Sequence, residues 1–492
     1  MNFRKIASVV LSIGALLTFA PSLPASAADS VLDDPELNDY ITAYMDAEHT
    51  PGLSLAAVNG DTVYYKNWGY NSIAQQIPAT EHTPYELASV SKAFTALSVL
   101  LLQEEGKLSV NDSVSDYLTW FDVKWQGERY DLKIWQLLNH TSGIPEKQTL
   151  KHTRPGTDEK LKEETARIAE GIDLGFEPGT DYEYCNLNYD ILAYLTEVVS
   201  GERFEDYVTR EIFLPIGMTE TGYDIPTAQG YQRCFLHTVE YNAPRFKGCQ
   251  GDGYVISTAA DMSLWIKAQL GQPELPEKLS AAIERSHHPE NASQYIKCGE
   301  ERDGTALYYA NGWKLTKDCG YIKHSGGNPN FSTMLCINCK SSTGTFAASN
   351  MMSAYSPEMA AKSAYRIMNG EIMNRLPADT SIDTIITPIA AAALLLMTVI
   401  FVFLLTQKKR LAKKSVNMKK EKRTLCLRLT VFILLLGVSL TLPYLVGYNY
   451  MTAAVWLPHS VLIAFTVIDL DLMLLIVSCI FRYIRQKRKA DE

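Results

Sequence analysis

The sequence of 492 residues predicts an α+β domain followed by three membrane-spanning helices, and three observations lead to this prediction. Segments with strand patterns lie near both ends of the region 28–380, with helical segments between them, as in a domain whose sheet joins both termini. Three apolar runs follow that region, and each is long enough to cross a bilayer as a helix. A short N-terminal segment has the charge and apolar pattern of an export signal.

Residues 1–27 are interpreted as a secretory signal peptide. Arg4 and Lys5 precede an apolar run at 6–20, and the small residues at 25–27 follow it. An uncleaved anchor is the alternative, but the run is short and a small-x-small site comes after it, so cleavage is expected after residue 27. The domain predicted at 28–380 should therefore lie outside the cytoplasmic membrane.

The domain begins with a helix and a hairpin. A helix is expected at about 37–48, followed by strands at 52–58 and 62–69. The dipeptide Asn59-Gly60 between these strands is a strong signal for a tight turn. These residues supply the N-terminal part of the predicted sheet.

The helix expected at about 89–105 is apolar nearly all round, which indicates a central and buried position. From 108 to 181 the sequence is polar and helical, which indicates an inserted helical subdomain. The charged stretch 158–164 is interpreted as its solvated face. His140 ends one of its helices, and a structural role is favoured over that of a catalytic base.

The C-terminal part of the domain returns to the sheet. A glycine-rich bend is expected at 324–332, between the strand that ends at His324 and a further hairpin. The other elements expected here are helices at 191–200 and after the cap Ser257 or Thr258, strands at 308–315, 321–324, 331–337 and 344–350, and a helix at 357–368.

The charge of the chain is divided between two regions. Residues 28–384 carry 29 Lys and Arg against 50 Asp and Glu, whereas residues 385–492 carry 15 against 5. An acidic domain argues against nucleic acid as a partner, because phosphate binding needs a basic surface. The basic residues of the tail alternate with apolar runs, so they indicate a membrane.

The region 381–492 predicts a three-helix membrane anchor with apolar runs at 385–405, 427–446 and 459–481. The link at 407–423 contains nine Lys and Arg, and the end of the chain is also basic. Positive loops stay in the cytoplasm, so the link and the tail are expected inside and the domain outside. The acids at 469 and 471 fall within the third run, where they are neutral, packed against a partner helix or part of a functional site.

Seven of the nine cysteines fall in the exported domain, so at least one is unpaired or pairs between chains. Pairing of sequence neighbours suggests Cys234 with Cys249, Cys298 with Cys319 and Cys336 with Cys339, which leaves Cys185 free. The Cys-x-x-Cys motif at 336–339 is not interpreted as a metal or redox site, because no second pair stands at zinc spacing. No metal or cofactor is expected.

Ser89 and Lys92 form the motif around which the domain is organised. Positions i and i+3 of a helix share a face, so the hydroxyl and the amine come within hydrogen-bond reach. A partly desolvated lysine then takes or relays the serine proton. A Ser-x-x-Lys motif is common by chance, and an ordinary helix start capped by a serine is the competing interpretation.

Two further motifs follow in order, Tyr184-x-Asn186 and His324-Ser325-Gly326. The three motifs together resemble the serine β-lactamase and penicillin-binding protein family, in particular its class C or serine D-peptidase branch. The resemblance covers about residues 40–370. It implies an antiparallel sheet flanked by helices, with a helical subdomain.

The resemblance also implies roles for these residues. Ser89 is the nucleophile that is acylated, Lys92 lowers the proton affinity around it, and Tyr184 acts as a phenolate-like base. Backbone N–H groups of Ser89 and Gly327 form an oxyanion hole. The groups expected to hold the substrate amide are Asn186, His324 and Ser325, and His324 stands where many members of the family carry lysine.

Within this branch, the chain resembles the membrane-anchored peptidases that activate prodrug precursors, such as the colibactin-maturing peptidase. Their substrate is an amide of an N-acyl-D-Asn, so Glu86, Asn328 and Asn330 become candidates for binding a D-Asn carboxamide. The expected partners are thus a small peptide or acyl-amino-acid substrate and the membrane. The alternatives are a D-Ala-D-Ala carboxypeptidase, a β-lactamase or an esterase, or a non-catalytic sensor of the cell envelope.

Overall fold

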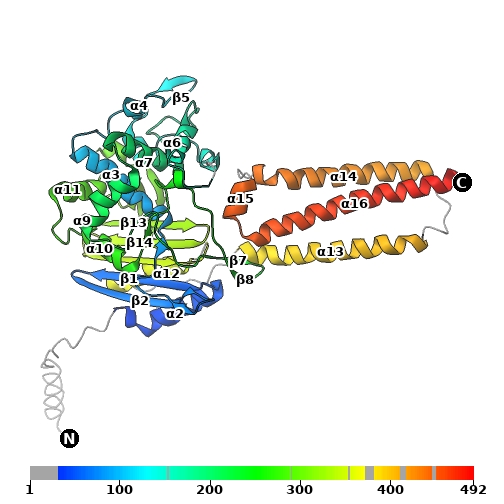
Figure 1. The fold of residues 1–492 in the computed structure, drawn as a ribbon, viewed down its shortest axis with the longest axis horizontal. Helices are drawn as coiled ribbons and strands as arrows, with labels where there is room; N and C mark the ends of the chain where they lie inside the picture. The colour runs from blue at the N-terminus through cyan, green and yellow to red at the C-terminus, as the bar shows by residue number, and fades with distance from the viewer. Residues whose placement is uncertain are drawn as a thin grey trace, which may run out of the picture.

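The computed structural model describes residues 31–151, 155–289, 291–352, 355–371, 382–410, 417–445 and 450–491. A mixed α/β body lies at one end, and three long helices extend from it side by side (Figure 1). The predicted signal peptide at 1–27 and the predicted domain boundary at 380 lie outside the described residues.

The body is built on a nine-stranded sheet in which every neighbouring pair of strands is antiparallel. The prediction that the sheet joins both ends of the domain is confirmed, because β1 pairs with β15 from Leu53↔Ser349 to Asn59↔Thr343. The strand order is β10 (Lys297–Glu300), β11 (Ala306–Ala310), β12 (Trp313–Leu315), β13 (Tyr321–Asn328), β14 (Phe331–Asn338), β15 (Thr343–Ser349), β1 (Gly52–Asn59), β2 (Thr62–Ser72) and β3 (Ile77–Pro78).

Both faces of the central strands are covered. On β1, Leu53 and Leu55 pack into one apolar layer, while Ala56 and Val58 pack into the other. Successive side chains of a strand point to opposite faces, so a strand covered on both sides is apolar at consecutive positions. One layer lies under α2 (Pro35–Glu48) and α12 (Ser356–Met368), which contact each other.

The other face carries the helices that position the candidate site. The central one is α3 (Lys92–Glu104), in which every residue from Lys92 to Leu102 is buried, as the sequence predicts. Around it lie α10 (Ala259–Gln269), α11 (Glu277–Ser286), α4 (Val114–Tyr117), α5 (Ile134–Leu138), α6 (Leu161–Ala166), α7 (Asn186–Ser200), α8 (Phe204–Val208) and α9 (Leu214–Ile216). Three short hairpins or bridges complete the body: β4 (Tyr85–Glu86) with β9 (Ile256–Ser257), β5 (Val123–Trp125) with β6 (Glu128–Tyr130), and β7 (Tyr231–Cys234) with β8 (His237–Glu240).

The interpretation of 158–164 as a solvated face is wrong for Lys162. This side chain is buried, and its Nζ lies 2.9 Å from Glu197 Oε1 and 2.7 Å from Glu205 Oε2. Two carboxylates from α7 and α8 make the burial of one ammonium tolerable. The ion pairs of Lys162 therefore join α6 to α7 and α8, and the side chain does not face solvent.

The expected bend at 324–332 is also corrected. Strand β13 continues through the glycines to Asn328, and Gly326 and Gly327 pair with Thr333 and Ser332 of β14. The turn itself is only the pair of residues between Asn328 and Phe331. Glycine permits the extended conformation as well as the turn, so its presence alone did not mark where the strand ends.

The suggested disulfides are not formed. All nine cysteines lie among the described residues, and each is a free thiol. Cys336 packs under α12, whereas Cys339 packs against the layer on the other side of the sheet. An odd separation along a strand places two side chains on opposite faces, so closeness in sequence does not bring these sulfurs together.

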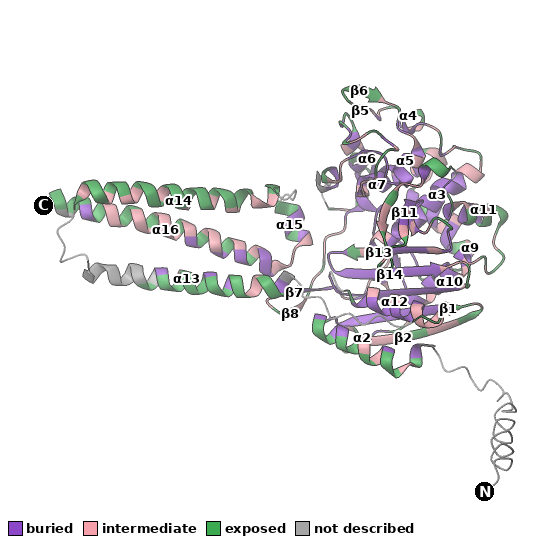
Figure 2. Cartoon of the chain, turned by 180° about the vertical axis from the view of Figure 1, so that it is seen from behind, coloured by how far each residue is buried: buried purple, intermediate pink, exposed green. Residues whose placement is uncertain are grey.

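The C-terminal region forms α13 (Ile382–Arg410), α14 (Met418–Leu445), α15 (Tyr450–Trp456) and α16 (His459–Asp491). Three of these helices contain stretches apolar and long enough to cross a membrane, namely Asp383–Ile400, Met418–Leu445 and His459–Arg488. Their surfaces are largely exposed, in contrast to the buried interior of the body (Figure 2). Asp471 is buried in α16, which packs against both α13 and α14, in agreement with the alternative of packing against a partner helix.

We expect Gly326→Ala to destabilise the body by about 1–3 kcal/mol, the usual effect of overpacking. A Cβ at this position would overlap the Leu87 carbonyl and the Thr333 hydroxyl and would lie 3.0 Å from Ala88 Cβ. Thermal unfolding measures the effect. Gly299→Ala is the matched control, because a Cβ there meets nothing within 4 Å. Equal melting temperatures for the two variants would contradict the tight contact.

Candidate active site

Ser89 lies in the short helical turn η2 (Ala88–Ser91) that joins β4 to α3. The residue before it, Ala88, has a φ of 49°, a left-handed conformation that non-glycine residues rarely adopt. Strand β13 packs directly on this turn, since Gly326 leaves no room for a side chain against Leu87 and Ala88. The turn is thus held in a strained conformation by the sheet beside it.

The ammonium of Lys92 lies at the centre of the site. Its Nζ donates to Ser89 Oγ at 3.0 Å and to the Asp252 carbonyl at 2.7 Å, and the side chain is fully buried. Burial lowers the pKa of this amine, but the charges of Tyr184 and Asp252 more than offset burial, so the pKa is raised. The predicted Ser89 and Lys92 contact is therefore present.

Tyr184 enters from the loop before α7, and Lys92 Nζ lies 5.0 Å from the centroid of its ring. Burial raises the pKa of its phenol, and the Lys92 ammonium opposes that shift without cancelling it. The two groups titrate as a pair. The directions of both pKa shifts favour an ammonium on Lys92 and a phenol on Tyr184 at neutral pH.

His140 packs against the Tyr184 ring, and among the described residues it forms no hydrogen bond with Ser89. The centroid of its ring lies 4.3 Å from that of Tyr184 and 4.5 Å from that of Tyr309. Its Nδ1 accepts a hydrogen bond from the Cys185 N–H at 3.2 Å. These contacts agree with the structural role favoured for this histidine.

His324 is buried on β13 and is neutral. Its Nδ1–H donates to the Ser325 carbonyl at 2.6 Å, and Nε2 lies 3.1 Å from Tyr309 Oη. Burial and the Lys92 charge lower the pKa of His324 to about 3. Position 324, where the family resemblance implies a lysine in many members, therefore carries no positive charge here. The Ser325 side chain is exposed.

A cavity of about 90 Å³ opens beside Ser89. Four predicted residues line it, namely Ser89, Asn186, Gly327 and Asn328. The other lining residues were not identified from the sequence, and they are Phe246, Cys249, Asp252, Gly253, Tyr254 and Trp456. Asn186 begins α7, and its Oδ1 is buried without a partner among the described residues, so it remains available to a substrate N–H.

Glu86 and Asn328 form a buried pair at one side of the cavity. Asn328 Nδ2 donates to Glu86 Oε2 at 2.6 Å, and Arg245 Nε lies 3.5 Å from Glu86 Oε1. Burial raises the pKa of Glu86, against the effect of both partners. Asn330 does not line the cavity: its Nδ2 donates to the Tyr241 carbonyl at 3.2 Å, and its side chain packs on Gly230.

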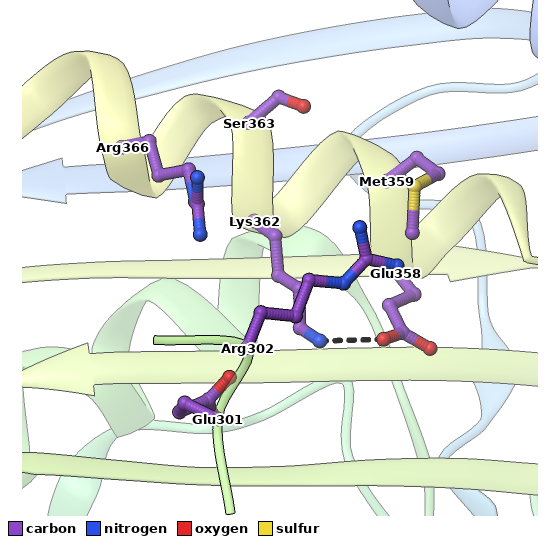
Figure 3. Close-up of a pocket in the computed structure, with 7 residues that line it drawn as sticks. All are labelled: Glu301, Arg302, Glu358, Met359, Lys362, Ser363 and Arg366. Atoms are coloured by element: carbon purple, nitrogen blue, oxygen red, sulfur yellow. Dashed lines mark hydrogen bonds and ion pairs between the residues drawn. The ribbon is translucent and has the colours of Figure 1, made fainter. Parts of the chain in front are cut away.

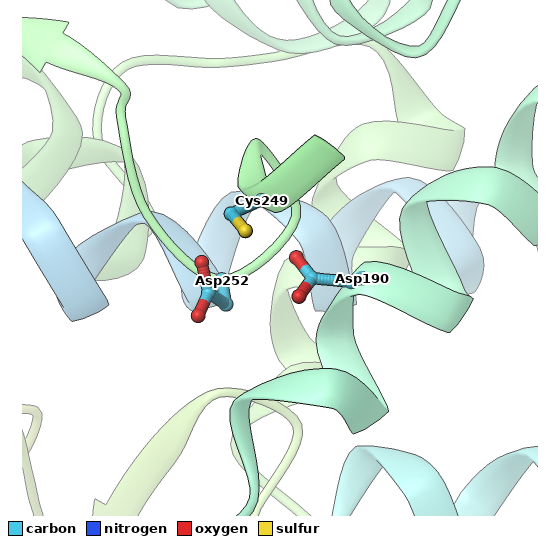
Figure 4. Close-up of side chains that lie close together, drawn as sticks. All are labelled: Asp190, Cys249 and Asp252. Atoms are coloured by element: carbon cyan, nitrogen blue, oxygen red, sulfur yellow. The ribbon is translucent and has the colours of Figure 1, made fainter. Parts of the chain in front are cut away.

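Three further buried groups, which the sequence did not identify as part of a site, lie behind Lys92. The carboxylates of Asp190 and Asp252 and the thiol of Cys249 converge from α7, a loop and the short turn η6 (Lys247–Cys249), with donor atoms within 4.8 Å of one another (Figure 4). Such a set has the donors of a cation site. Lys92 already supplies a positive charge to it, and burial raises the pKa of Asp252 to about 6. The sequence offered a signal only for Asp190, which lies four residues after Asn186 and therefore on the same face of the helix.

A second hollow, of about 100 Å³, lies along α12 (Figure 3). Two of its lining residues form an ion pair with each other, since Lys362 Nζ lies 2.5 Å from Glu358 Oε1, and Glu301 pairs with Lys323 outside the lining set. We assign it no role.

Comparison with protein families matches residues 37–367 to the family described as Beta-lactamase. Protein flp of Staphylococcus aureus is 28% identical over 439 residues, which cover 85% of this chain and 84% of that protein. Penicillin-binding protein 4* of Bacillus subtilis is 31% identical over 309 residues, which cover 58% of this chain and 64% of that protein.

Solved structures show the same fold. The octameric penicillin-binding protein homologue from Pyrococcus abyssi matches with a TM-score of 0.58 and 24% identity, covering 70% of this chain and 79% of that one. A class C beta-lactamase matches with a TM-score of 0.58 and 20% identity, covering 70% and 97%. The predicted fold class is confirmed.

We expect the rate at which a fluorophosphonate modifies Ser89 to rise with pH across the neutral and mildly alkaline range. The pKa values of Lys92 and Tyr184 are both raised, so at neutral pH the pair holds one proton too many to accept the serine proton. The reactive fraction then grows about tenfold per pH unit until the pair loses that proton. Rates measured by mass spectrometry test this, and a rate constant independent of pH between about 7 and 9 would contradict it.

Proposed function

This chain belongs to the beta-lactamase family, and from that premise we propose that it is a membrane-anchored serine hydrolase acting outside the cytoplasmic membrane. Its substrates in this proposal are amides of acyl-D-amino acids, cleaved through an acyl-enzyme on Ser89. The observation that carries the proposal is the 3.0 Å hydrogen bond from a fully buried Lys92 Nζ to Ser89 Oγ.

In the proposed acylation, Ser89 Oγ attacks the carbonyl carbon of the scissile amide. The serine proton passes to the Lys92 and Tyr184 pair in its singly deprotonated form, and a C–O bond forms. The C–N bond then breaks, and the pair returns the proton to the leaving amine. Attack by water releases the acid product and restores the hydroxyl of Ser89.

The negative charge on the carbonyl oxygen needs donors in a fixed place. Backbone N–H groups of Ser89 and Gly327 are the proposed donors, and both residues line the cavity. Loss of one such donor typically slows acyl transfer about 10²–10³-fold. Gly327 suits this role because a Cβ there would meet nothing within 4 Å, which leaves room for substrate.

A D-Asn carboxamide is the substrate group that the Glu86 and Asn328 pair supports best. Asn328 lines the cavity, and its hydrogen bond to Glu86 fixes the direction of its amide. An amide can both accept and donate, so it complements the two faces of a carboxamide. The neutral His324 offers no cation for the free carboxylate of a terminal D-Ala.

A D-Ala-D-Ala carboxypeptidase is the second candidate, supported by the similarity to penicillin-binding protein 4*. In that case Arg245, which lies 3.5 Å from Glu86 and is only partly buried, is the available cation for the terminal carboxylate. A non-catalytic sensor is disfavoured, because a receptor has no need of a buried ammonium aimed at a serine hydroxyl.

The three long apolar helices support attachment to the membrane. The basic link and tail place the body on the outer side in this proposal.

Incubation with a fluorophosphonate tests the reaction itself. We expect one adduct, located on Ser89 by fragment-ion mass spectrometry, and none in Ser89→Ala. Tyr184→Phe should slow labelling by about 10²–10⁴-fold, the usual contribution of general acid–base help. Ser91→Ala is the matched control and should keep the adduct, because its hydroxyl is engaged with the Val255 N–H. Modification that persists in Ser89→Ala would rule out the proposed nucleophile.

A panel of three anilides tests the substrate. N-acyl-D-Asn, N-acyl-L-Asn and N-acyl-D-Ala anilides are compared with Ser89→Ala as the blank, and we expect the D-Asn compound to be cleaved best. A polar pocket offered a methyl group leaves donors and acceptors unpaired, which costs up to about 10⁴–10⁵ in specificity. Asn328→Ala should reduce this preference. Faster cleavage of the D-Ala compound would favour the carboxypeptidase instead.

A further inference from the structure

One wall of the Ser89 cavity comes from the membrane region. Trp456 is the last residue of α15, which lies between α14 and α16 at the end nearest the body (Figure 1). The residue stands outside the segment 37–367 that defines the family. The family fold alone therefore does not enclose this site.

The contact between α15 and the body is a small apolar junction. Phe246, Cys249 and Tyr254 of the body form a buried apolar cluster with Val455, and Trp456 packs against that cluster. The Tyr241 hydroxyl donates to the Val455 carbonyl at 3.0 Å. These contacts fix the end of α15 against the same residues that line the cavity.

Polar contacts hold the neighbouring helices in place. Asp383, at the start of α13, is buried and accepts hydrogen bonds from the Phe235 and Leu236 N–H groups and from the Ser460 hydroxyl. At the start of α16, His459 Nδ1 lies 2.8 Å from Gln232 Nε2. The first residues of α13 and of α16 are thus both hydrogen-bonded to the hairpin β7–β8.

The position of Trp456 limits the space beside Ser89. The cavity is about 90 Å³, well below the roughly 300–1,000 Å³ of pockets for drug-sized ligands. Phe246, Tyr254 and Trp456 give one side of it an aromatic surface, while Asn186 and Asn328 supply amides. An aromatic surface of this kind favours a compact apolar group.

We infer that Trp456 is a specificity-determining residue, which limits the size of the apolar substituent that the site accepts beside the scissile bond. This inference rests on the proposed reaction of Ser89. The substrate class is accordingly the proposed acyl-D-amino-acid amide, carrying a compact apolar group in addition to the carboxamide that Asn328 binds. Trp456 contributes one wall to this size limit, and the other nine lining residues come from the family domain.

Two fluorophosphonates test the inference on the full-length protein in detergent, one bearing an ethyl group and one a naphthylmethyl group. In the wild type the ethyl probe should modify Ser89 faster. Trp456→Ala should raise the rate of the bulky probe relative to that of the ethyl probe by about tenfold or more, the usual scale of discrimination by pocket volume. Trp456→Phe should give a smaller increase in the same direction.

Met451→Ala is the matched control, because this residue is exposed on the same helix. It should leave both rates unchanged. An unchanged ratio of the bulky-probe rate to the ethyl-probe rate in Trp456→Ala, or an equal loss of both rates, would overturn the inference. The proposed reaction would still be supported in that case if the ethyl probe modifies Ser89 of the wild type. Failure of both probes on the wild type would instead overturn the proposed function, and this inference with it.

Discussion

The structure depends on the burial of one ammonium group. Removing an ion from water costs several kcal/mol even after relaxation, so a buried lysine persists only where the protein supplies acceptors and opposing charge. Lys92 receives acceptors from the Ser89 hydroxyl and the Asp252 carbonyl oxygen, and opposing charge from the Asp252 carboxylate. Because these groups come from different segments, placing α3 at the centre of the body is a condition for the site and not only for the core.

The sheet also constrains the turn that carries Ser89. Strand β13 lies against η2 at the glycines after His324, and the same strand supplies Gly327 and Asn328 to the cavity. The strained backbone of Ala88 is held by this contact. A side chain at Gly326 would push β13 away from η2. Glycine is therefore required here for steric reasons, both for the packing of the sheet and for the position of Ser89.

The C-terminal helical region also contributes to the site. Its junction with the body buries Asp383 and brings Val455 and Trp456 against the aromatic side of the cavity. A hydrolase of this family fold with helices that served only as a tether would not need such contacts. The arrangement brings the end of the three-helix region against residues that shape the site.

The sequence by itself determined the fold class, the three apolar helices and the contact between Ser89 and Lys92, because each follows from local spacing. Hairpin signals, hydrophobic runs and the i, i+3 geometry of one helix need no knowledge of distant residues. It misjudged the bend after His324 and the pairing of Cys336, since glycine permits several conformations and sequence distance does not reveal which face of a sheet a side chain occupies. Only the tertiary structure decided the directions of the pKa shifts of Lys92 and Tyr184 and the presence of Trp456 in the cavity wall. Burial and the approach of segments hundreds of residues apart set pKa values and cavity walls, and neither quantity is encoded in any local pattern.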